Sequence, residues 1–150
     1  MSRTLRFECV YPQPIETVWD AITDPVAISE WLMPNDFKAE LGHEFQFRSQ
    51  PQGNWDGIVY CKVLLVEAPH DLVYSWYNKQ IQTELSFHLE SVEGGTRLEL
   101  VHSGFAGFFA TMLSVLMGSG WKRIVHVQLR TVLEKLVHGE ALSGKPMCRN

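Results

Sequence analysis

The order of segments along this chain constrains its fold more than any single motif does. One alternating strand and two short helical stretches around Trp19 and Trp31 come first, followed by a series of alternating strands from Phe37 to Ser103. From Trp121 to His138 the hydrophobic period changes from two residues to about 3.6, which is typical of an amphipathic helix. A long helix in such a chain is buried against one antiparallel sheet. We therefore predict an α+β fold in which a curved sheet of six or seven strands wraps around a C-terminal helix, with a cavity between them.

The strand boundaries follow from two-residue alternation and from turn residues. Pro12 and Pro14 end the first strand, and Pro14 and Pro25 suit the first turns of the two short helices, the second of which Asp24 can cap. Along the fourth strand, the apolar set that ends at Leu65 is expected to point inward, although a β-bulge would reverse this locally. The predicted strands cover residues 5–10, 37–41, 45–48, 58–66, 72–77, 84–90 and 98–102.

Length and composition bound the possible functions. With 150 residues, of which 45% are hydrophobic, the chain is expected to form one domain over residues 1–140, followed by a disordered tail at 141–150. A net charge of -4 without a dense run of Lys or Arg argues against a nucleic-acid partner. The N-terminal residues lack the apolar core of a signal peptide, so a cytoplasmic location is expected. Cys9, Cys61 and Cys148 share no CxxC spacing, which favours reduced thiols, with Cys9 and Cys61 as small apolar core residues.

The segment from Ser103 to Gly120 contains no ionisable side chain and reaches the lower limit of membrane-spanning length. Four glycines and several hydroxyl residues dilute its hydrophobicity, which argues against a transmembrane span. We expect a lid or a buried helix here, with Gly118–Gly120 as the loop that starts the last helix. The alternative is a dimer or membrane-surface contact. The apolar part, Phe105 to Met117, predicts self-association into a homodimer if it is exposed.

No pattern in the sequence indicates a metal or a cofactor. The six histidines show neither HExxH nor close pairing with cysteine, and GxSxG, a P-loop and GxGxxG are all absent. His102 is the best candidate for acid–base chemistry, but the sequence identifies no partner for it. We therefore predict no cofactor, no metal site and no catalytic residues, and catalysis is the less favoured interpretation.

Strand and helix parity indicates which side chains face the predicted cavity. His102 shares a strand face with two leucines, and it is interpreted either as a cavity residue or as a core histidine bonded to backbone or to a hydroxyl group. Gln128 falls within the apolar arc of the last helix, where its amide needs a partner from the sheet or from a ligand. Tyr74 offers a hydroxyl and an aromatic wall. The predicted ligand-binding residues are Trp31, Phe45, Phe47, Val59, Cys61, Tyr74, Trp76, Leu85, Phe87, Leu98, Leu100, His102, Trp121, Val125, Gln128 and Val132.

Four groups of residues occur in an order that is similar to a known family. They are Tyr11–Pro25 with Trp31; Gly57–Val59 followed by Val66–Pro69 and Leu72–Trp76; Gly94–Leu100 with His102–Phe105; and Gly120–Trp121. Over about residues 3–138 the chain resembles the activator of heat-shock protein 90 ATPase homologue-like family, within the START-like helix-grip superfamily of polyketide cyclases and lipid carriers. This chain departs from the family in Asp71, where an arginine is usual, and in the long apolar segment before Trp121.

Three functions are compatible with these observations. The leading hypothesis is a protein that binds a small hydrophobic, lipid-like or polyketide-like molecule in an internal cavity lined by aromatic residues. The resemblance implies a second, a chaperone accessory that uses exposed charges such as Lys38, Glu40 and Lys62. The third is a cyclase-type or hydrolase-type enzyme that uses the same cavity through His102.

Overall fold

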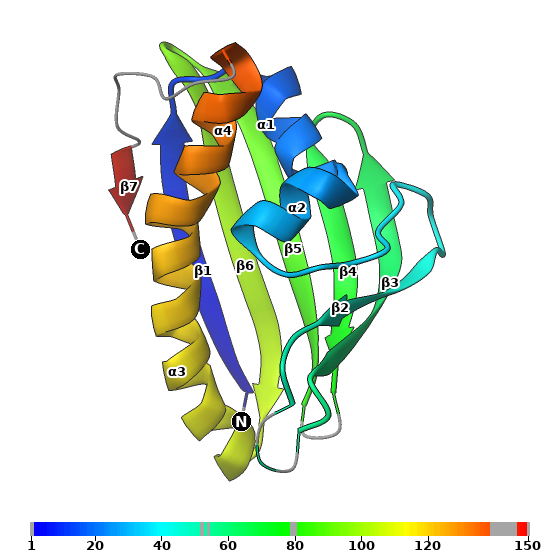
Figure 1. The fold of residues 1–150 in the computed structure, drawn as a ribbon. Helices are drawn as coiled ribbons and strands as arrows, with labels where there is room; N and C mark the ends of the chain where they lie inside the picture. Colours follow the sequence, from blue (N-terminus) through cyan, green and yellow to red (C-terminus); the bar gives the residue numbers. More distant parts are fainter. Residues whose placement is uncertain (1, 52, 54, 79–80, 139–146, 150) are drawn as a thin grey trace.

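The computed structural model describes residues 2–149 except 52, 54, 79–80 and 139–146. All described helices lie on one face of a single antiparallel sheet (Figure 1). Across the sheet the strand order is β2-β3-β4-β5-β6-β1-β7. The elements in chain order are β1 (Ser2–Tyr11), α1 (Ile15–Thr23), α2 (Pro25–Trp31), β2 (Glu44–Arg48), β3 (Ile58–Glu67), β4 (Asp71–Tyr77), β5 (Gln82–Val92), β6 (Gly95–Ala106), α3 (Phe108–Arg123), the π-helical turn η1 (Ile124–Gln128), α4 (Leu129–His138) and β7 (Met147–Arg149).

The predicted α+β helix-grip architecture is confirmed. Helices α3 and α4 form one continuous rod with η1, and the rod runs along β1 on the same side of the sheet as α1 and α2 (Figure 1). Asp24 caps α2 by accepting a hydrogen bond from the Ala27 N–H at 3.4 Å, and Pro25 occupies its first turn, as the sequence predicts. The Trp31 indole N–H then donates to the Ala21 carbonyl at 2.7 Å, which ties α2 to α1.

The strand prediction is wrong at residues 37–41, which form an irregular segment instead of half a hairpin. Phe37 is buried and its ring packs edge-on against Phe45 at 5.0 Å. The segment that precedes it borders the open edge of β2, where Asp36 Oδ1 accepts the Gln46 N–H at 2.8 Å. The Pro34 carbonyl likewise accepts the Arg48 N–H at 3.0 Å. The chain thus shields the outer edge of β2, a common way to prevent edge-to-edge pairing.

A β-bulge interrupts β3 between Val63 and Leu65. Beside it, the Ser75 hydroxyl oxygen accepts the Lys62 N–H at 2.9 Å, in place of a backbone acceptor. Val63 points into the core, whereas Leu64 and Leu65 are 41% and 37% exposed. The inward orientation predicted for Leu65 is therefore wrong, because the extra residue of a bulge reverses the parity that follows it.

The rod begins thirteen residues before the predicted start of the last helix at Trp121. Strand β6 continues to Ala106, and Gly107, with φ 93°, makes the turn into α3. Residues 118–120, predicted as a loop, lie within the helix. Gly118 lies beside β1, and an added Cβ there would make an ordinary van der Waals contact, 3.6 Å from a methyl carbon of Leu5. Among the described residues, no helix combines the length and the apolar character that crossing a bilayer requires.

The π-helical turn is matched to a tyrosine from the sheet. The Tyr11 hydroxyl donates to the carbonyl oxygen of Val125 at 2.6 Å, in a position where Tyr11 is fully buried. A π turn leaves carbonyl groups without the usual helical partner, and the tyrosine supplies one. Burial raises the pKa of Tyr11 far above its ordinary value, so the hydroxyl remains a donor.

At the far edge of the sheet, β7 pairs antiparallel with β1, with Cys9 directly opposite Cys148 in the register. The tail predicted to be disordered at 141–150 therefore contains a strand at 147–149, because these residues find open backbone groups on β1. Residues 141–146 and 150 lie outside the described residues. Cys9 is disulfide-bonded, so the prediction of a reduced thiol is wrong for this residue. Cys61 is a free, buried thiol, as predicted.

Candidate functional site

Most of the predicted cavity is filled by the residues that were expected to line it. Side chains from β2, β4, β5 and β6 meet under the helices and form a packed aromatic and aliphatic core. The Tyr74 ring, for example, lies 5.1 Å from that of Phe45 and 5.9 Å from that of Phe87. The predicted site residues that are at most 2% exposed are Trp31, Phe45, Phe47, Val59, Tyr74, Leu85, Phe87, Leu98, Leu100, His102, Trp121, Val125 and Val132.

An apolar hollow remains at one end of this core, between the sheet, the end of α2 and helix α3. It consists of two adjoining parts of about 270 Å³ and 170 Å³, both of which are lined by Met33, Trp76 and Met117. We call it the Trp76 hollow. The first part is also lined by Trp55, Val59, Asn78 and Leu113, and the second by Leu32, Gly120, Trp121 and Ile124.

Each wall of the Trp76 hollow is held by a separate element. Trp76 lies on β4, with its ring 5.4 Å from Phe47 and 5.6 Å from Trp121. Trp55 is fixed in the loop before β3 because its indole N–H donates to the Ile58 carbonyl at 3.0 Å. Leu113 and Met117, four residues apart, lie on the face of α3 that covers the hollow. Helix α3 is therefore one wall of the hollow.

His102 belongs to a chain of hydrogen bonds that runs from Trp121 to Trp76, two residues that line the hollow. The indole N–H of Trp121 donates to His102 Nδ1 at 3.0 Å, so the ring proton is on Nε2. That N–H lies 2.7 Å from the Thr83 hydroxyl oxygen, which accepts it, and the Thr83 hydroxyl donates to the Trp76 carbonyl at 2.9 Å. Burial lowers the pKa of His102 to about 3. The imidazole is neutral and both nitrogens are occupied, which leaves no position for acid–base chemistry or for a ligand.

The other predicted polar residues do not reach the hollow either. Gln128 is half-buried in η1 and lines neither part of it. Tyr74 is enclosed by aromatic rings, and burial raises its pKa well above the ordinary value. Of the predicted site residues, only Val59, Trp76 and Trp121 line the hollow, and within the described part of the chain no group of His, Cys, Asp and Glu side chains could hold a metal ion.

Several lining residues escaped the sequence prediction. Trp55 lies outside the predicted strands and helices, where parity carries no information, and Met33 falls at the end of the second predicted short helix, just before Pro34. Leu113 and Met117 belong to a segment for which no inward face was predicted. The available signal was the presence of large apolar side chains in loops, next to glycine, proline and asparagine. Such residues in polar surroundings often cover a cavity or an interface.

A larger hollow of about 470 Å³ lies elsewhere, on the outer face around β2, β3 and β4. Phe45 and Cys61, both predicted to bind a ligand, border it from below. Its other walls are exposed or half-buried polar and aromatic side chains, among them Glu44, Lys62 and Tyr77. This hollow is wider but more polar than the Trp76 hollow, and no side chain that lines it is both polar and buried. We therefore take the Trp76 hollow as the candidate site.

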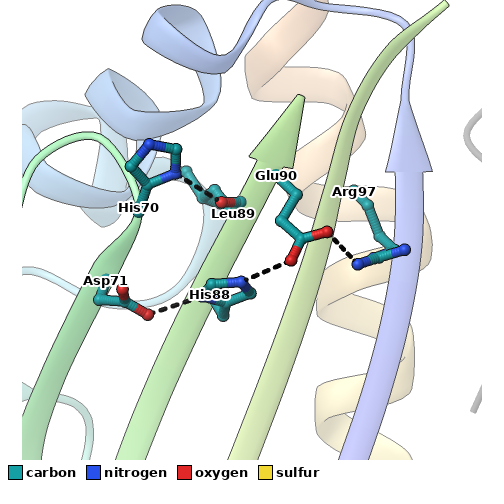
Figure 2. Close-up of polar contacts among 6 residues, drawn as sticks. All are labelled: His70, Asp71, His88, Leu89, Glu90 and Arg97. Carbon is teal, nitrogen blue, oxygen red and sulfur yellow. Dashed lines mark hydrogen bonds and ion pairs between the residues drawn. The ribbon is translucent and has the colours of Figure 1, made fainter. Parts of the chain in front are cut away.

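The outer face of the sheet also carries a row of charges from β4, β5 and β6 (Figure 2). His88 Nδ1 lies 2.6 Å from Asp71 Oδ1, its Nε2 lies 3.0 Å from Glu90 Oε1, and Glu90 pairs with Arg97. Carboxylates only accept, so both ring nitrogens donate and His88 is an imidazolium. Its pKa is raised first by the hydrogen bond to Asp71 and then by that to Glu90. Asp71, the departure from the family pattern, thus has a structural role.

A curved antiparallel sheet that grips a long helix, with an apolar hollow between them, defines a helix-grip protein. The model of the family described as "Activator of Hsp90 ATPase homolog 1-like protein" matches residues 12–134, and the chain belongs to this family. No curated protein matches the chain.

Solved structures agree with this assignment. A protein from Mesorhizobium loti shares 32% identity and superposes with a TM-score of 0.76, covering 93% of this chain and 100% of its own. A protein from Bacillus halodurans shares 30% identity with a TM-score of 0.75, covering 88% and 97%. The Aha1 dimer from Colwellia psychrerythraea shares the fold at 17% identity, with a TM-score of 0.74 and coverage of 93% and 99%.

Proposed function

We propose that this protein binds a small, uncharged, largely aromatic or apolar molecule in the Trp76 hollow. The observation that supports this most directly is the composition of the walls, in which Trp55, Trp76 and Trp121 surround a space next to Met33 and Met117. Ligand pockets are usually concave and apolar, with few polar groups. Methionine side chains are flexible, so the two that line both parts can adapt to ligands of different shape.

The walls of the Trp76 hollow favour an uncharged ligand. None of the described residues that line the Trp76 hollow is ionisable, and Asn78 is the single amide among them. A charged ligand would lose its hydration without gaining an ionic partner, which costs far more than apolar contact returns. The larger part of the hollow, about 270 Å³, lies just below the usual range of about 300–1,000 Å³. A compact ligand of a few rings, or one short acyl chain, suits this space.

The experiment is to fill the hollow and measure binding of a neutral dye. Nile red fluorescence is titrated against the parent protein, Leu113→Trp and Leu116→Trp. Leu113 faces the hollow, whereas Leu116, three residues further along α3, is 72% exposed. We expect at least tenfold weaker binding for Leu113→Trp and little change for Leu116→Trp. Equal binding by all three proteins would rule out the hollow as the site.

A chaperone accessory role is the second candidate, and family membership favours it. Such a role would use the outer surface, where Lys38, Glu40 and Lys62 are exposed. The test is the ATPase rate of purified heat-shock protein 90 with and without this protein. Stimulation that persists in Leu113→Trp and is lost when the three charges are reversed would support this role, and no stimulation at any ratio would reject it.

We also propose that the outer face of α3, formed by Met112, Val115 and Leu116, contacts a second copy of the chain. These side chains are 57%, 56% and 72% exposed, which is unusual for neighbouring large apolar residues on a helix. The outer edges of β2 and β1 are covered by residues 34–36 and by β7, so the helix is the larger exposed apolar surface. The solved dimer with the same fold is consistent with self-association. Phe105, predicted as part of this contact, is instead fully buried in β6.

The cytoplasmic location predicted from the sequence remains part of this proposal. Cell fractionation with an antibody to the native protein tests it, and recovery in a membrane or extracellular fraction would contradict it.

A further inference from the structure

The outer edges of β2 and β1 are covered in different ways. The outer edge of β2 is covered by the segment just before it, through the Pro34 carbonyl and the Asp36 carboxylate. The outer edge of β1 is covered by β7, a strand of three residues from the distant C-terminal end of the chain. A strand this short has few backbone hydrogen bonds, so its position on β1 calls for a further attachment.

Cys9 indicates what that attachment is. Cys9 is disulfide-bonded, and it is 1% exposed on the inward side of β1. Cys61 is a free thiol, and the chain contains three cysteines in all. Cys148 lies directly opposite Cys9 in the β1–β7 register. Opposed residues in antiparallel strands have Cα atoms about 4.5–5.5 Å apart, within the range of about 4.4–6.8 Å that a disulfide requires.

We propose that Cys9 and Cys148 form a disulfide that holds β7 on the edge of β1, and that its reduction opens this edge. The bond forms when one cysteine thiolate attacks an oxidised small-molecule disulfide, such as oxidised glutathione, and releases one thiol. The second cysteine then displaces the remaining thiol from the mixed disulfide. The two cysteines lose two electrons and two protons, and the oxidant becomes two thiols, so the exchange balances.

The surroundings of Cys9 determine how the bond responds to a reductant. Its sulfur lies 3.9 Å from the carbonyl oxygen of Val125, between the sheet and the π turn. The thiolate of an added reductant can attack the Cys9 sulfur only after β7 separates from β1. Reduction of the native protein should therefore be slow compared with reduction in denaturant, and the bond should respond to sustained changes of redox state. In a reducing compartment the edge of β1 would be open, and oxidation would close it.

The first test identifies the bonded pair. The full-length protein is oxidised with oxidised glutathione, alkylated in denaturant without reductant, digested and analysed by mass spectrometry. We expect a linked peptide pair that contains Cys9 and Cys148, with Cys61 alkylated. Cys148→Ser should raise the thiols that react in denaturant from one to two, whereas Cys61→Ser should leave the linked pair intact. Alkylation of both Cys9 and Cys148 in the oxidised protein, or a link from Cys9 to Cys61 or to another chain, would overturn the proposal.

The second test measures the edge itself. Hydrogen exchange is followed in peptides that cover Glu8–Val10 and Met147–Arg149, with β5 and β6 peptides as the internal control. We expect exchange of the C-terminal peptide to accelerate at least tenfold on reduction, and Cys148→Ser to behave like the reduced parent. The control peptides should not change. Equal exchange in the oxidised and reduced parent would show that the bond does not hold β7, and would overturn that part of the proposal.

Discussion

The indole N–H of Trp121 donates to His102 Nδ1 at 3.0 Å and thereby joins the long helix to the sheet. This bond fixes the tautomer of His102 and directs its remaining proton to Thr83. The ring of His102 also packs 4.6 Å from that of Phe105 and 5.3 Å from that of Trp76. Strand parity predicts that His102 faces a cavity. In the structure its ring instead links the long helix, through Trp121, to the sheet, through Thr83.

Removal of the Thr83 hydroxyl should weaken this connection. Thr83→Val leaves the His102 N–H buried without an acceptor, which is expected to lower the free energy of unfolding by about 1–3 kcal/mol. Urea unfolding at pH 7 measures the change. Thr83→Ser keeps the hydroxyl and serves as the control, with a smaller loss. A Thr83→Val protein as stable as the parent would contradict the hydrogen-bond chain described for His102.

Acid should destabilise the fold through the same histidine. The pKa of His102 is about 3 in the folded protein, compared with an ordinary value of 6.5. Below pH 6.5 the unfolded chain binds a proton that the folded chain does not, so stability falls as the pH falls from about 6.5 toward 3. This residue alone contributes a slope of up to about 1.4 kcal/mol per pH unit. Comparison of stability at pH 7 and pH 5 in the parent and in His102→Gln tests this, and identical slopes would refute it.

His88 should act in the opposite direction. Its pKa is raised, so the stability from its imidazolium is fully present below about pH 6.5 and is lost as the pH rises through the folded-state value. Because the His88 and Asp71 side chains are 40% and 35% exposed, solvent screening limits this contribution to about 0.5 kcal/mol. Asp71→Asn should lower the His88 pKa, which NMR titration of the ring protons measures. An unchanged His88 pKa in Asp71→Asn would contradict the pairing, and Glu84→Gln, on the same strand as His88, is the control.

Gln13 offers a stabilising substitution. It is 2% exposed, and within the described structure neither its amide nitrogen nor its amide oxygen has a hydrogen-bond partner. An unsatisfied buried amide costs about 1–3 kcal/mol. Gln13→Met keeps the length of the side chain, and we expect it to raise the free energy of unfolding by about 1 kcal/mol in thermal or urea unfolding. Gln13→Glu would bury a charge and should destabilise the protein, so equal stability of the two variants would contradict this account.

The outer face of α3 predicts the state of association. Leu116→Glu places a charge on an exposed apolar face, so it should shift a dimer toward monomer by at least tenfold in dissociation constant while folding is unchanged. Sedimentation equilibrium over a hundredfold concentration range measures this. Leu136→Glu, at a position 45% exposed on α4, is the matched control. A parent protein that is monomeric at every concentration would reject the proposed contact.

Periodicity in the sequence was sufficient to predict the architecture, because a sheet with one buried face and a helix with one buried face both leave regular patterns. The inward sets on β4, β5 and β6 match their predicted parity residue by residue, as Leu85, Phe87 and Leu89 illustrate. The pattern failed where an inserted residue shifts it. The bulge near Leu65 is such a place, and it has no signature in the residue types alone.

The candidate site was harder to predict than the fold. Parity identifies which side chains point inward but not how much space they leave, and here Phe45, Phe47 and Tyr74 fill the centre. The remaining space lies at one end and is closed by Met33 and Trp55, which belong to irregular segments. The disulfide of Cys9 was also missed, because its register partner lies in a tail whose sequence shows no strand pattern.

The π turn at Ile124–Gln128 separates the rotational phases of the two helices that it joins. One additional residue in a helical turn rotates everything that follows by about 100° relative to an uninterrupted helix. Trp121, Val125 and Leu129 follow one another at intervals of four residues and are all buried. In an uninterrupted α-helix of 3.6 residues per turn, each such step would rotate the next side chain by about 40° away from the sheet. The wider π turn thus keeps the buried side of the rod on the sheet, and the Tyr11 hydroxyl holds it at the Val125 carbonyl.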